Sequence, residues 1–279
     1  MIKPMLAHKV GKKEVDWSAK NFIQPKLDGV RCIFTKDGAY SRTGKQFKNV
    51  AHLEEDLEDF FKKYPDTVLD GELYNHDLKH DFEKIISLVR KQKPTDEDRF
   101  EAGNLVQYHV YDVITSLNPT YETRYNMLRM NLPIYKTMTL VANTTVDSME
   151  EAKMLHDVHL AKGYEGSMLR TNGFYEQKRS YNLQKFKDFH DTEATITGYE
   201  EGKGKRQGTL GKFLMTDDEG IQFGCPPGKG YTYKDLANML LNIHDYIGQR
   251  ATFTYFQRTQ AGSYRHLSLI HISEPTRPY

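Results

Sequence analysis

The chain has few cysteines, no long hydrophobic run and almost no net charge, and each shortage excludes a class of protein. Its two cysteines, Cys32 and Cys225, are too few for a disulfide framework and show no zinc-ligand spacing. No run of about 18 apolar residues predicts a membrane-spanning helix, and no secretory hydrophobic segment opens the chain. We therefore expect a cytoplasmic protein that binds no membrane. With 39 basic and 38 acidic residues, a polyanionic partner would need local basic patches.

The length of 279 residues predicts two domains, and the pattern of elements changes near residue 190. The strands predicted before this point are 22–25, 31–35, 68–73, 105–114, 165–170 and 183–189, and the helices are 50–63, 81–91, 120–132 and 148–162. Most connections between these strands are too short for repeated crossover helices. The pattern favours an α+β domain of antiparallel sheets with flanking helices at residues 1–189.

Residues 190–266 are predicted to form a second, smaller domain. Short strands are expected at 194–199, 212–215, 221–224 and 250–258, with one helix at 233–243. This content suits a small five-stranded β-barrel of the oligonucleotide-binding (OB) fold. Residues 267–279 are set apart, because 267–277 resembles the translation of a transposon-type sequencing adapter; a native polar tail is the alternative. We expect this tail to lie outside the fold, with the natural sequence interrupted near His266.

The segment with the most chemistry is Lys26-Leu27-Asp28-Gly29. Asp-Gly between two β-rich runs is typical of a hairpin turn, so this segment alone is weak evidence for a function. Five further segments follow it in order, namely 41–45 (SRTGK), 69–74 (LDGELY), 108–113 (YHVYDV), 165–170 (EGSMLR) and 183–187 (LQKFK).

Together and in this order, these segments resemble those of the ATP-dependent DNA ligases, particularly the small phage-encoded ones, within the covalent nucleotidyltransferase superfamily. The resemblance runs from Lys3 to about Arg265. It implies a nucleotidyltransferase (adenylation) domain at 1–189 and an OB-fold DNA-binding domain at 190–266. The implied activity is sealing of 3′-OH/5′-phosphate nicks in double-stranded DNA through lysyl-AMP and a DNA-adenylate. We expect a monomer that serves DNA repair, replication or recombination, in the host cytoplasm if it is phage-encoded.

The resemblance also assigns catalytic roles. Lys26 would be the nucleophile, and its amine can attack the α-phosphate of ATP only when desolvation or nearby cations have removed its charge. Asp28 is implied in the later steps at the nick. Lys185 and Lys187 are implied in nucleotide binding and in stabilising charge on the transferring phosphate. Without the resemblance, two alternating lysines are as typical of a solvated strand edge.

Further residues are implied in binding ATP and a metal ion. Glu165 would hold Mg²⁺, for which Mn²⁺ could substitute, and Glu72 would bind the ribose or the same metal. Tyr111 would stack on adenine, while Arg31 and Arg42 would contact ribose or phosphate. Taken singly, such carboxylates are usually surface groups, and such a tyrosine is usually a core residue.

Two features depart from the family pattern. Gln24 stands where relatives often carry glutamate, although glutamine can still offer an acceptor to the exocyclic amine of adenine. Ligase barrels commonly end in a basic motif that orients the departing pyrophosphate. Here residues 262–266 reach the approach to that motif before the adapter-like segment begins. The first step, self-adenylylation, would then be impaired.

Residues 201–212 contain four glycines and four cations, and they predict a DNA contact. The cations are Lys203, Lys205, Arg206 and Lys212. Glycines let backbone amides approach phosphates, and lysines displace counterions. The segment lacks the Gly-Lys-Ser/Thr of a Walker loop. A solvated hairpin is the alternative interpretation.

Two other functions stay open from the sequence. One is another covalent nucleotidyltransferase, either an RNA ligase or a guanylyltransferase of the mRNA-capping type. The other is a nucleic-acid-binding protein with impaired catalysis. Arg31, which follows the Lys-x-Asp-Gly segment, and the basic segment 201–212 favour a DNA ligase.

Overall fold

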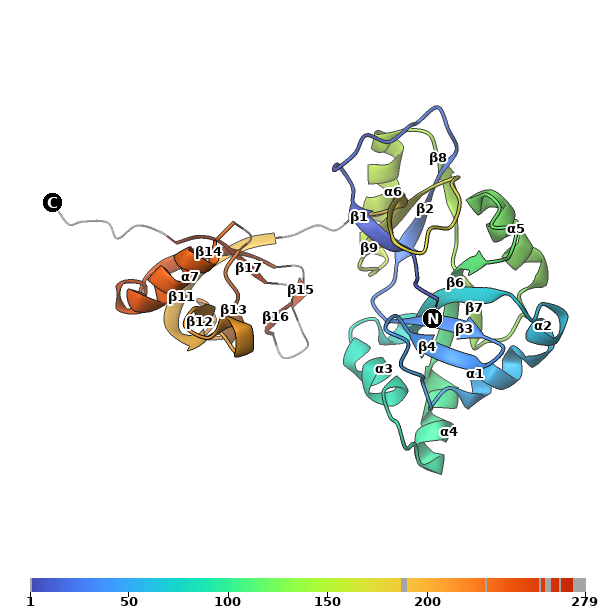
Figure 1. The fold of residues 1–279 in the computed structure, drawn as a ribbon, viewed down its shortest axis with the longest axis horizontal. Helices are drawn as coiled ribbons and strands as arrows, with labels where there is room; N and C mark the ends of the chain where they lie inside the picture. The colour runs from blue at the N-terminus through green and yellow to red at the C-terminus, as the bar shows by residue number, and fades with distance from the viewer. Residues whose placement is uncertain are drawn as a thin grey trace. The chain divides into compact units, whose positions relative to one another are not determined.

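The chain divides into two compact units, Met1–Lys187 and Asp188–Tyr279, shown in Figure 1. The structure is a computed structural model that describes residues 2–186, 190–228, 230–255, 257–258, 262–265 and 267–272. Among these residues, no helix is long and apolar enough to cross a membrane. The division falls close to the domain boundary predicted at residue 189.

The first sheet of the Met1–Lys187 unit has the strand order β1-β10-β9-β2-β8. Its strands are β1 (Leu6–Lys9), β2 (Asn21–Lys26), β8 (Thr144–Val146), β9 (Gly166–Thr171) and β10 (Arg179–Phe186). Helix α6 (Met149–Ala161) packs on this sheet, and its Ala152 joins Ile23 and Leu169 in one apolar cluster. Trp17, the only tryptophan of the chain, packs against the same cluster.

The second sheet of this unit has the order β4-β3-β5-β6-β7. Its strands are β3 (Val30–Thr35), β4 (Gly38–Ser41), β5 (Val68–Tyr74), β6 (Gln107–Ile114) and β7 (Met138–Leu140). The helices beside it are α1 (Ala51–Asp56), α2 (Glu58–Lys63), α3 (Phe82–Val89), α4 (Asp96–Leu105) and α5 (Tyr121–Asn131). Strand residues such as Phe34, Leu69 and Tyr108 pack with residues of these helices in the main core.

A β-bulge in β6 gives this sheet an irregular register. Asp70 of β5 pairs with Asp112 of β6, but the next residue, Gly71, pairs with Val110, which leaves Tyr111 as the extra residue. A bulge of this kind sets two residues of one strand against one residue of its neighbour and re-aims their side chains. Tyr111 and Asp112, although consecutive, therefore both contact groups of the first sheet rather than alternating between faces.

The Asp188–Tyr279 unit is built on an antiparallel five-stranded sheet of order β13-β12-β11-β14-β17. Its strands are β11 (His190–Glu201), β12 (Leu210–Thr216), β13 (Gln222–Cys225), β14 (Arg250–Tyr255) and β17 (Ser268–Ile272), with a short ribbon of β15 (Gln257–Arg258) and β16 (Tyr264–Arg265). Helix α7 (Tyr233–Leu241) packs on it through Leu236 and Met239. The long strand β11 pairs with both β12 and β14.

The predicted α+β class is confirmed, and every predicted strand and helix has a counterpart within a few residues. Two edge pairs differ from the predicted antiparallel pattern, because β1 pairs with β10 and β6 pairs with β7 in parallel. The second case follows from α5, which crosses over between β6 and β7 as parallel neighbours require. Helix α4 was not predicted from the sequence. Only Ala102 is buried on it, so its sequence lacks the periodic apolar residues that predict a helix.

The segment 267–279 was expected to lie outside the fold, but Ser268–Ile272 forms the edge strand β17. It pairs antiparallel with β14, and Leu269 is buried in the core of the unit. Backbone pairing at a sheet edge needs only an extended chain, and one apolar residue facing inward is enough to fix its face. The origin of this segment stays a prediction, and residues 273–279 lie outside the described part of the chain.

We predict that His109 makes the Met1–Lys187 unit lose stability as the pH falls from ~7 to ~5. Burial lowers the pKa of His109 to about 4, so the unfolded chain takes up a proton at a higher pH than the folded one. For this residue alone the loss is about 2 kcal/mol. Urea unfolding followed by Trp17 fluorescence measures it, and His109→Gln should lose correspondingly less. Equal losses in both proteins would contradict the prediction.

Candidate active site

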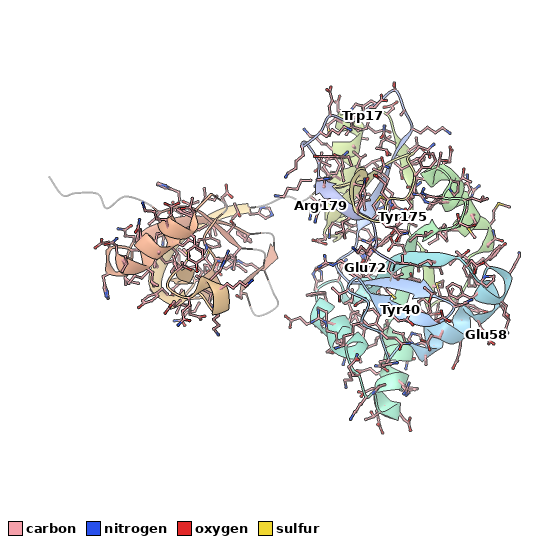
Figure 2. All side chains as sticks on the ribbon, viewed as in Figure 1. Trp17, Tyr40, Glu58, Glu72, Tyr175 and Arg179 are labelled. Atoms are coloured by element: carbon pink, nitrogen blue, oxygen red, sulfur yellow. The ribbon has the colours of Figure 1, made fainter. Side chains whose placement is uncertain are left out.

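A cavity of about 260 Å³ lies in the Met1–Lys187 unit, where the end of β2 meets side chains of both sheets. Seven predicted site residues line it, namely Gln24, Lys26, Arg31, Arg42, Glu72, Tyr111 and Lys185. Figure 2 labels Glu72 on the second sheet and Arg179 on the first, with Tyr175 near the junction of the two. The fold thus brings together residues that lie up to 161 positions apart, from Gln24 to Lys185 (185 − 24).

Lys26 ends β2 and forms an ion pair with Glu165, a carboxylate that is only 4% exposed. The backbone N–H of Glu165 donates to the carbonyl of Lys26 at 3.1 Å, which fixes the two residues side by side. Gly166 follows with a φ of +149°, and a Cβ there would lie 2.6 Å from the carbonyl oxygen of Phe186. Only glycine therefore allows β9 to enter the sheet at the point that places Glu165 beside Lys26.

Glu72 lies on β5, opposite Arg31 on β3. The pKa of Glu72 is raised to about 7, mainly by burial and also by the negative charge of Glu165, against the lowering effect of Arg31 and Lys26. The hydroxyl of Tyr111 donates to Glu72 Oε2 at 3.3 Å. Near neutral pH this carboxyl group can therefore either carry or release a proton.

The two carboxylates, Glu72 and Glu165, fit the chemistry of a Mg²⁺ site only in part. Within the described residues, no group of three or more histidines, cysteines or acids could hold a metal ion. Mg²⁺ commonly binds one or two carboxylates and completes its shell with substrate phosphates and water. The donor set therefore fits a metal that arrives together with a nucleotide.

Two guanidinium groups lie close to the ring of Tyr111. The Cζ atoms of Arg31 and Arg170 lie 5.2 and 5.4 Å from its ring centroid. Arg31 is also paired in two places with Asp70, through Nε–Oδ1 at 2.6 Å and Nη2–Oδ2 at 2.5 Å. Tyr175 donates to the same carboxylate at 2.6 Å. The charge of Arg31, predicted to contact ribose or phosphate, is thus already partnered within the protein.

A buried network behind Tyr111 was not predicted from the sequence. Asp112 is 0% exposed and accepts from two arginines, Arg124 on α5 (Nε–Oδ1, 2.7 Å) and Arg170 on β9 (Nη1–Oδ2, 2.8 Å). Nε of Arg170 also donates to Gln24 Oε1 at 2.7 Å. Both Asp112 and Arg170 lie in segments singled out as motifs, but no spacing rule showed that they meet.

The remaining predicted residues lie in different places. Arg42 is exposed in the turn after β4 and contributes to the cavity wall. Asp28 is half-buried in the turn after Lys26 and is not part of the cavity wall. Lys187 lies outside the described residues. Arg179, which was not predicted, also lines the cavity.

Comparison with known protein families assigns this chain to a family. Residues 4–187, more than half of the chain, match the family model of the ATP dependent DNA ligase domain. The chain belongs to the ATP-dependent DNA ligase family. Residues 201–272 match the DNA ligase OB-like domain, which confirms the predicted OB fold of the second unit. This match, like β17, extends into the segment that resembles a sequencing adapter.

Individual ligases resemble the chain at modest identity. The DNA ligase of Enterobacteria phage T6 is 25% identical over 243 residues, which cover 70% of this chain and 50% of that protein. The DNA ligase of Haemophilus influenzae is 24% identical, with 87% of this chain and 83% of that protein covered. A solved structure from a study of DNA binding with a minimal scaffold by Lig E DNA ligases is 25% identical, with a TM-score of 0.81 and 98% and 100% coverage.

The chain spans about half the length of the phage and African swine fever virus ligases that it matches. The activity of those longer proteins is therefore only proposed for this chain, in the next subsection.

The basic segment of this ligase-family chain lies in the OB-like unit. Lys203, Lys205 and Arg206 are exposed around a 3₁₀ turn, Gly204–Arg206. Lys212, on β12, forms an ion pair with Glu200 at 2.9 Å. The first three cations thus face solvent together, whereas the charge of Lys212 is partly neutralised by its neighbour.

We predict that Asp112→Asn destabilises the Met1–Lys187 unit by about 3–5 kcal/mol, because two buried arginines lose their shared counter-charge. Urea unfolding followed by Trp17 fluorescence measures the change. The matched control is Asp59→Asn on α2, where the side chain is 95% exposed and the expected change is within about 0.5 kcal/mol. A similar, small effect of both substitutions would show that the network contributes little.

Proposed function

We propose that this chain is an ATP-dependent DNA ligase that seals 3′-OH/5′-phosphate nicks in duplex DNA and carries AMP covalently on Lys26. The observation that supports this most strongly is the position of the Lys26 amine. It lies in contact with Glu165, in a cavity that also holds an aromatic ring, a second carboxylate and several cations. A covalent nucleotidyltransferase needs this combination, because one lysine must lose a proton beside a phosphate that gains negative charge.

In the proposed first step, Nζ of Lys26 attacks the α-phosphorus of ATP. A P–N bond forms, the bond from the α-phosphorus to the bridging oxygen breaks, and pyrophosphate leaves. Glu165 Oε2, in contact with Nζ, is placed to accept the proton that the ammonium group releases. Mg²⁺ bound by the nucleotide phosphates and by Glu72 or Glu165 would supply positive charge to the phosphate oxygens.

In the proposed later steps, AMP passes from Lys26 to the 5′-phosphate of a nick, and the 3′-hydroxyl then displaces AMP to close the strand. Lys185 and Arg42 on the cavity wall supply positive charge to the reacting phosphates. Lys187 is proposed to share this role, and Asp28 to act at the nick. The protein is proposed to act as a monomer, with the OB-like unit gripping DNA through its exposed basic turn.

We expect Lys26→Ala to abolish covalent uptake of label from ATP, because the change removes the amine that contacts Glu165 in the cavity. The measurement is incubation with α-labelled ATP and Mg²⁺, followed by denaturing electrophoresis. Lys62→Ala, a change of an exposed lysine on α2, is the matched control and should label like the unchanged protein. Label retained by Lys26→Ala, or label taken from GTP in preference to ATP, would contradict the proposal.

The nucleic-acid substrate is tested separately with matched nicked DNA and nicked RNA duplexes. Sealing of the DNA nick by protein that already carries AMP supports a DNA ligase even where loading from ATP is slow. Preferential sealing of the RNA nick would assign the chain to the RNA ligases instead. Binding of DNA without any sealing or labelling would make it a binding protein of the ligase fold.

We predict that replacing Lys203, Lys205 and Arg206 together by alanine weakens binding to nicked duplex DNA and lowers its salt dependence. Three lost phosphate contacts reduce the slope of log K against log salt by about 2.7. Fluorescence anisotropy at several salt concentrations measures this slope. Lys212→Ala should change it less, because Lys212 is paired with Glu200. An unchanged slope in the triple variant would show that DNA binds elsewhere.

A further inference from the structure

Arg170 makes a contact inside the cavity that has no role in the steps described so far. Its Nε donates to Oε1 of Gln24 at 2.7 Å, and both side chains are almost fully buried, at 3% and 1% exposure. On the other side of the amide, Nε2 of Gln24 points to the carbonyl oxygen of Val141 at 3.5 Å. Gln24 is thus held at both ends of its amide group.

The chemistry of Arg170 decides which way the Gln24 amide is turned. The oxygen and nitrogen ends of a glutamine side chain have nearly the same shape but opposite hydrogen-bonding character. A guanidinium group only donates, so the end that faces Arg170 must be the oxygen. Reversing the amide would set two donors against each other in a buried site, where an unsatisfied donor is costly.

Arg170 is itself held in place, so it can act as a fixed reference for Gln24. Its Nη1 donates to Asp112, which Arg124 also grips. Arg124 is anchored in turn to the carbonyl oxygens of Pro119 and Gly173 at 2.6 and 3.1 Å. A guanidinium fixed through this many partners has little freedom to follow a rotating amide.

Gln24 and Arg170 line the same cavity as Tyr111 and Met168, and Met168 is the direct neighbour of Gln24 across the β2–β9 pair. A purine that stacks on Tyr111 would therefore have Gln24 within its surroundings. Adenine carries a donor amine at the position where guanine carries an acceptor oxygen. An amide oxygen accepts from the first but repels the second, whereas an amide nitrogen does the reverse.

We propose that Arg170 is a positioning residue for base selection. By fixing the Gln24 amide with its oxygen as the available acceptor, it makes the cavity prefer ATP to GTP. The oxygen has two lone pairs, so it can accept from the exocyclic amine of adenine while it holds Arg170. This inference rests on the proposed function, because it assumes that the nucleotide bound in the cavity is the one that labels Lys26.

The test is a double-mutant cycle on the full chain, first freed of any bound adenylate with pyrophosphate. The second-order rate constant of self-adenylylation is measured with ATP and with GTP. Arg170→Lys keeps the positive charge beside Asp112 but loses the Nε donor, and it should lower the ATP/GTP preference by about tenfold. In a Gln24→Glu background the same substitution should change the preference less than about twofold, because a carboxylate has two acceptor oxygens and no wrong orientation.

A purely structural role for Arg170 gives a different result. It would lower the rates both with Gln24 and in the Gln24→Glu background. Arg170→Lys would then leave the ATP/GTP preference unchanged, or would change it by the same factor in both backgrounds. Either result overturns the inference. A protein that takes up no label from either nucleotide overturns the proposed function, and this inference with it.

A second measurement needs no variant that could fail to fold. Purine riboside triphosphate lacks the exocyclic amine, so the unchanged protein should use it about tenfold less well than ATP. Equal use of both nucleotides would show that the Gln24 oxygen does not read the amine, and would overturn the inference.

Discussion

The candidate site depends on one buried carboxylate, Asp112, which is shared by two arginines from different parts of the unit. It lies on β6 of the second sheet, while Arg170 belongs to β9 of the first sheet and Arg124 to α5. Burying charges is costly unless partners satisfy them, and here each guanidinium gains at least one further acceptor. The two sheets are thus joined by directional bonds at the cavity wall, where apolar packing alone would leave them free to slide.

A second polar tie, through Asp70, works in the same way. Asp70 on β5 pairs with Arg31 and accepts from Tyr175, and the backbone N–H of Met5 donates to the Tyr175 hydroxyl at 2.9 Å. Arg31 of this tie and Arg170 of the first both line the cavity with Lys26, so part of its wall is held by buried hydrogen bonds. Such preorganisation suits a reaction in which charge develops on a phosphate, because little reorientation of the protein is then needed.

Much of this arrangement could be predicted from the sequence, and the failures have physical reasons. The order of the motifs predicted that Lys26, Glu72, Tyr111 and Lys185 would share a site, and the structure places all four on one cavity. Asp112 was missed because strand periodicity assigns it to the face opposite Tyr111. The bulge in β6 shifts the register by one residue, so that Tyr111 and Asp112 do not alternate between the two faces of the sheet. A single sequence shows no sign of such an inserted residue. Parallel pairing at the edges was missed because the edge strands β1 and β7 are only four and three residues long and were not among the predicted strands.

The edge strand β17 has a consequence for how tolerant the OB-like unit is. It contributes backbone hydrogen bonds to β14, and its Leu269 is buried in the core with Ile272 packed beside it; none of the proposed site residues lies on it. Many unrelated peptides can meet these requirements, because an edge strand needs little more than an extended backbone and apolar side chains at the inward-facing positions. The other positions of β17 should therefore accept many substitutions, which makes this edge a natural place to graft a tag or an additional module.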